Sequence, residues 1–308
     1  MAEITAAQVK ELREKTGAGM MDCKKALTEA NGDFDEAVKV LRKKGLAAAG
    51  KKAGRITSEG IAWAGVVEGK AVAVEVNSET DFVAQNAEFR GLVERIAGVA
   101  AASSAETVEQ LAEEKWPGDP EGRTVAQIIS ENIAKIGENI SLRRFVRYEA
   151  TPKTVFGTYI HGNGKIAVVV RLEAEGGDRQ KVAELASNIA MHVAAAEPRF
   201  LRREDVTQAD LDTEREIARD QALKSGKPEA VVEKIVSGKM EKFYGETVLS
   251  EQPYVREEKT SIRQLLEQTG REAGASIELT GFTRYKLGEG LERRNEDFAA
   301  EVMQQAGL

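Results

Sequence analysis

A strand-like segment occurs twice in this chain, and the repeat limits the folds that the chain can adopt. The two copies are 71–76 (AVAVEV) and 167–172 (AVVVRL), which begin 96 residues apart. Each copy follows a glycine-containing turn, and each turn follows another strand-like run, 61–67 or 155–160. Two such runs joined by a short turn predict an antiparallel hairpin. The sequence therefore predicts two hairpins of similar construction.

An alanine-rich stretch follows each predicted hairpin, and its apolar residues recur at the spacing of one helix face. These residues are Leu92, Ile96 and Ala97 in the first stretch, and Leu185, Ile189 and Ala190 in the second. A helix of this kind can bury one face of a small sheet. We therefore expect an α+β fold whose core consists of two copies of an antiparallel-sheet-plus-helix module.

The first 55 residues predict three short helices separated by tight glycine turns. Thr5 with Gln8 can form a capping box on the first helix, and Asp33 with Glu36 can cap the third. We expect the third helix to stop near Gly45. Three short helices have a core that is marginal for independent stability, so we expect the bundle to be stabilised by docking or by a partner.

The second of these helices begins with two adjacent methionines, Met20 and Met21. Adjacent helical positions point about 100° apart, so both side chains cannot face one narrow core. We expect one methionine to lie in the core and the other to be a soft, adaptable contact at the surface.

Beyond the bundle and the two hairpin-plus-helix modules, the sequence predicts a helical hairpin and several single helices and strands. Residues 210–224 and 229–242 lack strand signals, are rich in charge and predict a helical hairpin, which can be a solvated arm or can pack on another copy of the chain. A helix at 124–135, a strand at 142–148, a strand at 277–287 and a terminal helix at 295–305 are also expected. We predict these parts: a bundle at 1–55, core subdomains at 56–140 and at 141–205 continued by 242–287, an arm at 206–241, and a C-terminal helical module at 288–308.

The overall charge argues against some partners. The chain has 44 Lys+Arg and 51 Asp+Glu, which leave a net charge of −7 and no global attraction to nucleic acid or anionic membranes. Residues 1–55 are locally basic, but 51–55 (KKAGR) is short and lacks an aromatic neighbour, so a solvated linker is favoured there. The chain shows no signal peptide and no apolar run that could span a bilayer, so we expect a cytoplasmic protein.

Reactive side chains do not converge in any recognisable motif. The two histidines are His161 in a predicted hairpin turn and His192 in a predicted helix, where it is more often a partly buried residue than a base. The one cysteine, Cys23, lies among lysines, which could lower its thiol pKa. Neither metal-ligand spacing nor a phosphate loop is present. We therefore predict no catalytic residues, no metal and no cofactor.

Three short segments carry a resemblance to a known family. They are 80–84 (TDFVA), 16–27 (TGAGMMDCKKAL) and 135–140 (KIGENI). With these motifs the chain resembles the bacterial elongation factor Ts family nearly from end to end. The resemblance implies a ubiquitin-associated-type bundle, a core of two subdomains, a helical protrusion and a C-terminal helix. It also implies a guanine-nucleotide exchange factor that binds elongation factor Tu with GDP, promotes GDP release and allows GTP to reload.

The resemblance further implies which residues contact elongation factor Tu. The exchange wedge would be Thr80, Asp81, Phe82 and Val83, with Asp81 and Phe82 inserted near the magnesium and phosphate site of the partner. The other implied contacts are Arg13, Met20, Met21, His161 and the C-terminal helix. The residues alone leave another interpretation open, in which Asp81 is a helix-end charge and Phe82 is a core residue or a hydrophobic staple.

Two other functions stay open on the residues alone. An RNA-associated adaptor would use the basic N-terminal segment, and its binding would depend steeply on salt. A metabolic enzyme would need a pocket with convergent acids and bases. Nucleotide exchange changes no covalent bond, so the family resemblance implies a protein that is not an enzyme.

Overall fold

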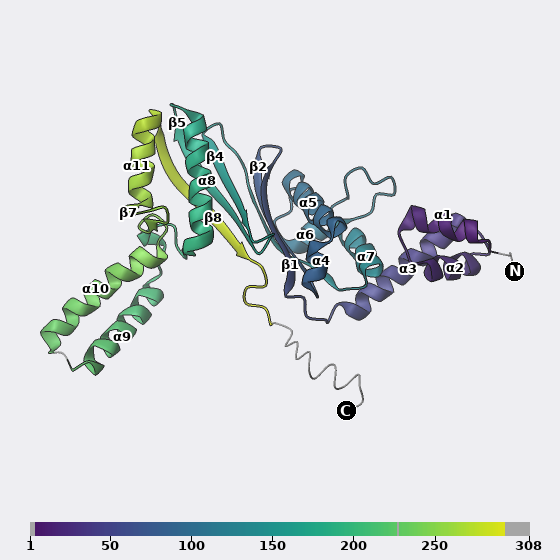
Figure 1. Cartoon of the computed structure of the whole chain (residues 1–308), viewed down its shortest axis with the longest axis horizontal. Coiled ribbons are helices and arrows are strands. Elements are labelled where there is room, and N and C mark those ends of the chain that lie inside the picture. Colours follow the sequence, from purple (N-terminus) through teal and green to yellow (C-terminus); the bar gives the residue numbers. More distant parts are fainter. Residues whose placement is uncertain (1–3, 227, 293–308) are drawn as a thin grey trace. The chain divides into compact units, whose positions relative to one another are not determined.

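The computed structural model describes residues 4–226 and 228–292 (Figure 1). It contains helices and sheets with antiparallel pairing, which confirms the α+β prediction. The chain separates into two compact units, one containing residues up to 63, 74–145 and from 286, and the other containing 64–73 and 146–285. The helix predicted at 295–305 lies outside the described residues, and the predicted domain boundaries stay a prediction.

Three helices form the N-terminal bundle, as predicted. They are α1 (Ala6–Thr16), α2 (Met20–Glu29) and α3 (Phe34–Lys52). The capping box of Thr5 with Gln8 is present, and the Asp33 carboxylate accepts a hydrogen bond from the Glu36 N–H at 2.9 Å. The buried core consists of small and medium side chains, namely Val9, Leu12, Cys23, Ala26, Leu27 and Ala37.

Helix α3 is longer than predicted, because it does not stop near Gly45 but continues to Lys52. Gly45 faces another helix, α7 (Val125–Ile136), and a Cβ at Gly45 would lie 3.5 Å from the Ala134 Cβ. A glycine inside a helix costs about 1 kcal/mol relative to alanine, and packing of this kind can offset that cost. The second half of α3 is therefore stabilised by a neighbour that is distant in the sequence.

The first sheet has the strand order β1-β2-β3. Its strands are β1 (Glu59–Val67), β2 (Lys70–Ser78) and β3 (Ile140–Tyr148). Every residue of β2 from Ala71 to Ser78 is buried. Between β2 and β3 the chain forms α4 (Asp81–Gln85), α5 (Ala87–Ala102), α6 (Val108–Glu113) and α7. The predicted inner face of α5, formed by Leu92, Ile96 and Ala97, is fully buried.

The second sheet has the order β4-β5-β8 and repeats the hairpin-plus-helix arrangement. Its strands are β4 (Thr154–His161), β5 (Ile166–Glu175) and β8 (Ser276–Lys286). Helix α8 (Arg179–Ala196) contacts both β4 and β5. The approach is close at Gly157, which pairs with Val170, because a Cβ at Gly157 would lie only 2.1 Å from the Ala186 carbonyl oxygen.

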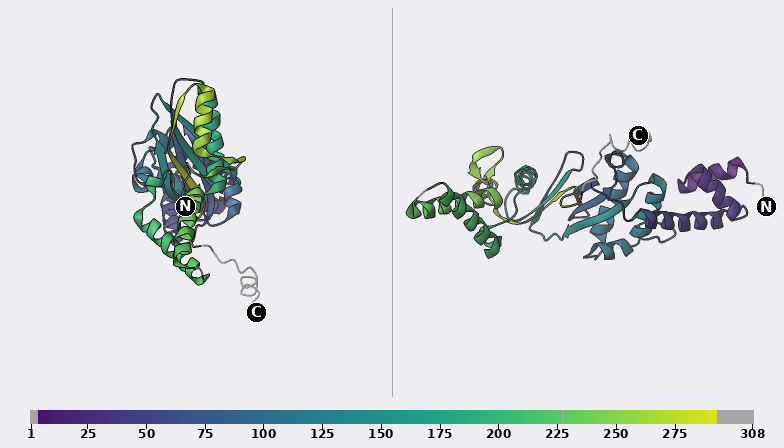
Figure 2. Two further views of the ribbon diagram at one scale, coloured as in Figure 1. Left: turned by 90° about the vertical axis from the view of Figure 1, so that its left-hand side faces the viewer. Right: turned by 90° about the horizontal axis from the view of Figure 1, so that it is seen from below.

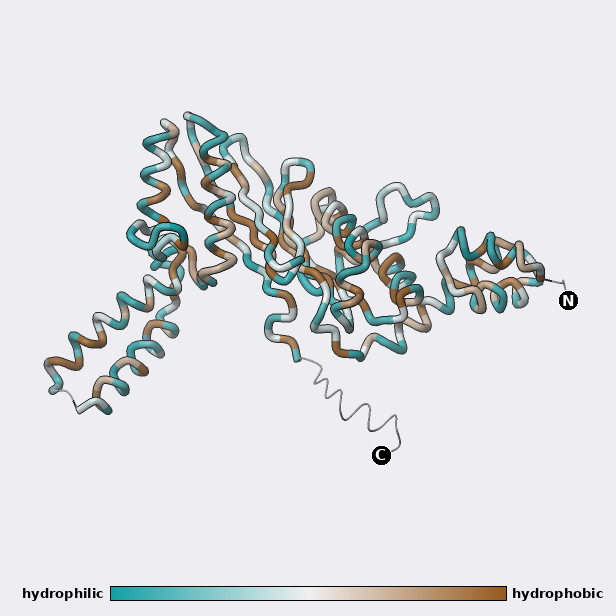
Figure 3. Tube along the Cα trace, viewed as in Figure 1, coloured by the Kyte–Doolittle hydropathy of each residue, from teal (hydrophilic) through white to brown (hydrophobic). Residues whose placement is uncertain are grey.

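The second unit also holds the predicted helical arm. Helices α9 (Gln208–Lys224) and α10 (Glu229–Thr247) lie side by side (Figures 1 and 2), and a short helix, Arg203–Asp205, precedes them. Figure 3 shows hydrophilic and hydrophobic residues mixed along both long helices. After the arm come the short strands β6 (Pro253–Tyr254) and β7 (Glu257–Ser261) and helix α11 (Ile262–Ala273). Self-association through the arm stays a prediction.

No helix within residues 4–226 and 228–292 combines the length and the apolar character that a membrane span requires.

Candidate functional site

The aromatic ring of Phe82 projects into solvent. Phe82 is 78% exposed, more than any other large apolar side chain in the described residues. Asp81 is exposed too, whereas the next two residues, Val83 and Ala84, are buried. Burying a phenylalanine side chain stabilises a protein by about 1.5–3 kcal/mol, so most are buried. The interpretation of Phe82 as a core residue is therefore wrong, and the exposed ring is a candidate contact for another molecule.

The local sequence explains why two exposed residues precede two buried ones. Positions two apart on a helix point about 200° apart, so Val83 and Ala84 facing inward leave Asp81 and Phe82 facing outward. Helix α4 contacts α5. Asn86 ends α4 and caps α5 by accepting a hydrogen bond from the Glu88 N–H at 2.8 Å. One side of this short helix is thereby fixed against the protein.

The first residue of this segment, Thr80, is held by a residue distant in the sequence. Thr80 occupies the N-cap position of α4, but its side chain does not cap the helix. Instead, the Glu138 carboxylate accepts hydrogen bonds from the Thr80 N–H at 2.9 Å and from the Thr80 hydroxyl at 2.7 Å. Glu138 lies in the turn between α7 and β3. The entry to α4 is thus tied to this turn.

The neighbouring residue, Glu79, is tied to the same turn. Its carboxylate accepts a hydrogen bond from the Asn139 N–H at 2.6 Å and another from the Arg55 side chain at 3.3 Å. The Asn139 side-chain amide donates to the Arg55 carbonyl oxygen at 3.2 Å. Glu79, Glu138 and Asn139 are not among the predicted contacts, although Glu138 and Asn139 lie in the motif 135–140. A prediction that β3 pairs with β2 in antiparallel fashion would have placed the start of β3 beside the end of β2.

Both methionines at the start of α2 are exposed, Met20 at 53% and Met21 at 64%. The expectation that one of them lies in the core is therefore wrong. The inner face of α2 begins one turn later, at Cys23, so the first turn extends past the small bundle core. Arg13 on α1 is exposed as well. These side chains are free to contact another molecule, and methionine suits such contacts because it is flexible.

His161 lies at the exposed end of β4, beside the turn that leads to β5. Its Nδ1 is 3.2 Å from the Tyr159 hydroxyl, and the two rings are 6.0 Å apart. His161 belongs to the second unit. Among the predicted contacts, residues 80–83 form the longest continuous segment, in which Asp81 and Phe82 are exposed and Val83 is buried. The other predicted contacts that the structure describes lie on α1, α2 and β4.

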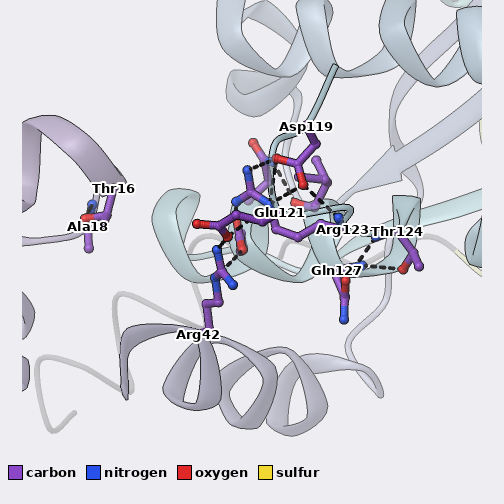
Figure 4. Close-up of polar contacts among 11 residues, drawn as sticks. Thr16, Ala18, Arg42, Asp119, Glu121, Arg123, Thr124 and Gln127 are labelled. Atoms are coloured by element: carbon purple, nitrogen blue, oxygen red, sulfur yellow. Dashed lines mark hydrogen bonds and ion pairs between the residues drawn. The ribbon is translucent and has the colours of Figure 1, made fainter. Parts of the chain in front are cut away.

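A network of charged residues joins α3 to the loop before α7 (Figure 4). Arg42 on α3 forms ion pairs with Glu121 and with Glu131, the latter at 3.7 Å. Arg123 donates hydrogen bonds to Asp119 and to Glu131, and the hydrogen bond from Arg123 lowers the pKa of the Asp119 carboxyl. The network provides a structural tie between the bundle and α7.

Two residues with reactive side chains are fully buried. Burial raises the pKa of the Cys23 thiol, so the expectation that neighbouring lysines could lower it is wrong. His192 is buried completely rather than partly, and its Nε2 lies 3.0 Å from Gln252 Oε1 while its Nδ1 accepts a hydrogen bond from the Val255 N–H. In the part of the chain that the structure describes, no three His, Cys, Asp or Glu side chains gather as ligands for a metal ion.

Known proteins resemble this chain over nearly its whole length. A family model described as elongation factor TS matches residues 79–289. The elongation factor Ts of Syntrophotalea carbinolica is 50% identical over 301 residues, which cover 97% of this chain and 98% of the relative. The elongation factors Ts of Rhodospirillum centenum and Clostridium perfringens are 49% and 50% identical and cover 100% and 99% of both chains, respectively. The chain belongs to the elongation factor Ts family.

Membership of the elongation factor Ts family makes this chain a protein of translation elongation. The family model begins at Glu79, so it includes the whole segment 80–83 as well as Glu138 and His161. The bundle with Arg13, Met20 and Met21 lies outside that range but is covered by the full-length relatives.

Proposed function

We propose that this chain is a guanine-nucleotide exchange factor for elongation factor Tu. It binds elongation factor Tu with GDP, promotes the release of GDP and leaves a form that reloads with GTP. One observation carries the proposal: Phe82 is 78% exposed on a short helix whose next two residues are buried. An aromatic ring held in solvent in this way is suited to enter a pocket of another protein. Family membership gives independent support.

In this proposal, Asp81 and Phe82 insert into the nucleotide-binding domain of elongation factor Tu, toward its magnesium and phosphate site, while Thr80 and the buried Val83 hold them in place on either side. Exchange is a coupling between two binding events, so the factor by which this chain weakens GDP binding equals the factor by which GDP weakens binding of this chain. Placing one phenylalanine in a pocket provides about 1.5–3 kcal/mol, or roughly one to two powers of ten in affinity.

The remaining coupling comes from the other contacts. Arg13, Met20 and Met21 pack on the nucleotide-binding domain, and His161 contacts another domain of elongation factor Tu. The exposure of both methionines and of His161 supports these assignments. No covalent bond changes in this reaction, so the chain acts by protein–protein binding and not as an enzyme.

The test is release of fluorescent GDP from elongation factor Tu, measured by stopped flow with the wild-type chain and with Phe82→Ala. We expect the variant to slow release by about tenfold to a hundredfold. Its circular dichroism spectrum and melting temperature should match those of the wild type, because the ring is mostly solvated. The control is Ile217→Ala, which truncates an apolar side chain that is 45% exposed on α9. Wild-type release by Phe82→Ala would refute the proposal.

A further inference from the structure

Helix α4 is too short to hold its own orientation. It has five residues, whereas isolated helices shorter than about 12 residues are marginal in water. Its N-cap residue, Thr80, provides no side-chain cap, so the free N–H groups of the first turn receive no help from that side chain. The direction in which Phe82 points is therefore set by contacts with the rest of the protein.

Contacts fix α4 from both ends. On its C-terminal side, Val83 and Ala84 are buried. On its N-terminal side, the two oxygens of Glu138 each accept one hydrogen bond from Thr80, Oε2 from the N–H and Oε1 from the hydroxyl. Hydrogen bonds to a carboxylate are about twice as strong as those between neutral groups. Because both donors belong to one residue, the pair fixes the backbone and the side-chain rotamer of Thr80 together.

The turn that carries Glu138 is itself fixed. Gly137 ends α7 in the left-handed conformation, with φ of 89°, and its carbonyl oxygen accepts a hydrogen bond from Lys52 Nζ at 2.6 Å. Asn139 donates its N–H to Glu79 at 2.6 Å. Adjacent residues 79 and 80 are thus bound to adjacent residues 139 and 138. These hydrogen bonds tie the end of β2 and the first turn of α4 to the turn before β3.

We propose that Glu138 is a positioning residue for Phe82, acting through its two hydrogen bonds to Thr80. The proposal rests on the exchange function above and adds to it the group that orients the ring. Without the carboxylate, α4 keeps its buried side but loses the tie at its entry. The ring then samples more directions, and fewer encounters with elongation factor Tu place it in the pocket.

The first test compares Glu138→Ala, Glu138→Gln and Thr80→Val in the GDP-release assay with the full chain and elongation factor Tu bound to fluorescent GDP. We expect Glu138→Ala to slow release about threefold to tenfold, as for the loss of one or two hydrogen bonds. Glu138→Gln keeps one acceptor and Thr80→Val keeps the backbone N–H, so both should show smaller losses. Glu113→Ala, an exposed glutamate at the end of α6, is the control.

The second test separates positioning from general stabilisation. In a Phe82→Ala background, Glu138→Ala should cause little further loss of release rate, because there is no ring left to orient. Hydrogen exchange should also become faster at the backbone amides of residues 80–82 in Glu138→Ala, while the amides of β2 and α5 keep the protection of the wild type. If Glu138→Ala fails to fold, Thr80→Val and Glu138→Gln carry the same comparison.

The results that would overturn the positioning role of Glu138 differ from those that would overturn the proposed exchange function. A wild-type rate for Phe82→Ala would overturn the proposed function and this inference with it. A slowed Phe82→Ala beside a wild-type rate for Glu138→Ala would overturn this inference alone. An equal loss from Glu138→Ala in the presence and absence of the Phe82 ring would also overturn it, because the carboxylate would then act independently of the ring.

Discussion

Glu75 on β2 accepts a hydrogen bond from Arg144 Nε on β3 at 2.6 Å, although the Glu75 side chain is completely buried. The other oxygen accepts hydrogen bonds from Arg143 Nη1 at 2.8 Å and from the Gly288 N–H at 2.9 Å. Burial by itself would raise the pKa of Glu75, but the hydrogen bonds from Gly288 and Arg143 and the charge of Arg144 outweigh it, and the pKa is lowered. One carboxylate thus joins two strands and the segment that follows β8.

We expect Glu75→Ala to destabilise the protein by about 3 kcal/mol, at the lower end of the range for removing one partner of a buried ion pair. The lower end applies because the Arg143 and Arg144 side chains are 23% and 30% exposed and can be hydrated. The measurement is the urea midpoint. The control, Glu258→Ala, alters an exposed glutamate of β7 and should change stability by less than about 0.5 kcal/mol. Equal midpoints for the two variants would contradict this role of Glu75.

The features of the fold that the sequence predicted are those encoded by local patterns. The repeat of 71–76 at 167–172 led to both hairpin-plus-helix modules, because short apolar runs next to turns and the spacing of helix faces are short-range signals. The TDFVA motif led to the segment around Phe82. The exposure of the Phe82 ring could not be derived from the residues, since the same motif is compatible with a buried ring.

The features that the sequence analysis missed depend on contacts between distant residues. Glu138 and Thr80 are 58 residues apart, and nothing in either segment alone indicates that they meet. The length of α3 depends on packing of Gly45 against α7. The exposure of both methionines depends on where the bundle core ends, which the spacing of apolar residues does not reveal. Tertiary contacts decided all three cases.

A double substitution, Met20→Ser with Met21→Ser, should weaken binding to elongation factor Tu without unfolding the bundle. We expect a loss of about tenfold in affinity, or roughly 1.4 kcal/mol, since two partly exposed side chains lose contact area. The measurement is a calorimetric titration of nucleotide-free elongation factor Tu. The matched control replaces Ile217 and Leu223 of the arm, which are 45% and 46% exposed, with serine. Equal affinity of the methionine variant and the wild type would argue against a contact at α2.

Two glycine-to-alanine substitutions should have opposite effects on stability. A Cβ at Gly157 would lie 2.1 Å from the backbone oxygen of Ala186, so β4 and α8 would have to separate. We expect a cost of about 3 kcal/mol, at the upper end for overpacking. Gly98 lies inside α5, and a Cβ there would meet nothing within 4 Å. Gly98→Ala should therefore stabilise the protein by about 0.5–1 kcal/mol. Thermal melts that move in the same direction for both variants would contradict this explanation.

The buried ring of His192 should make stability depend on pH. Burial lowers the His192 pKa below its usual value of 6.5, and the hydrogen bond with Gln252 compensates only in part. In the unfolded chain the ring binds a proton more readily than in the folded protein. The stabilisation from the neutral ring is therefore fully present above pH 6.5 and is lost as the pH falls through the folded-state pKa. Protonation would also turn Nδ1 into a donor facing the Val255 N–H.

The measurement is the urea midpoint between about pH 8 and about pH 5, a range in which most carboxylates keep their charge. The wild type should lose stability on acidification, by about 1.4 kcal/mol for each unit by which the pKa is lowered. His192→Gln should be less stable at the alkaline end, because a core side chain has changed, but its stability should vary less with pH. If the stability of His192→Gln instead depended on pH as steeply as that of the wild type, a group other than His192 would have to take up the proton.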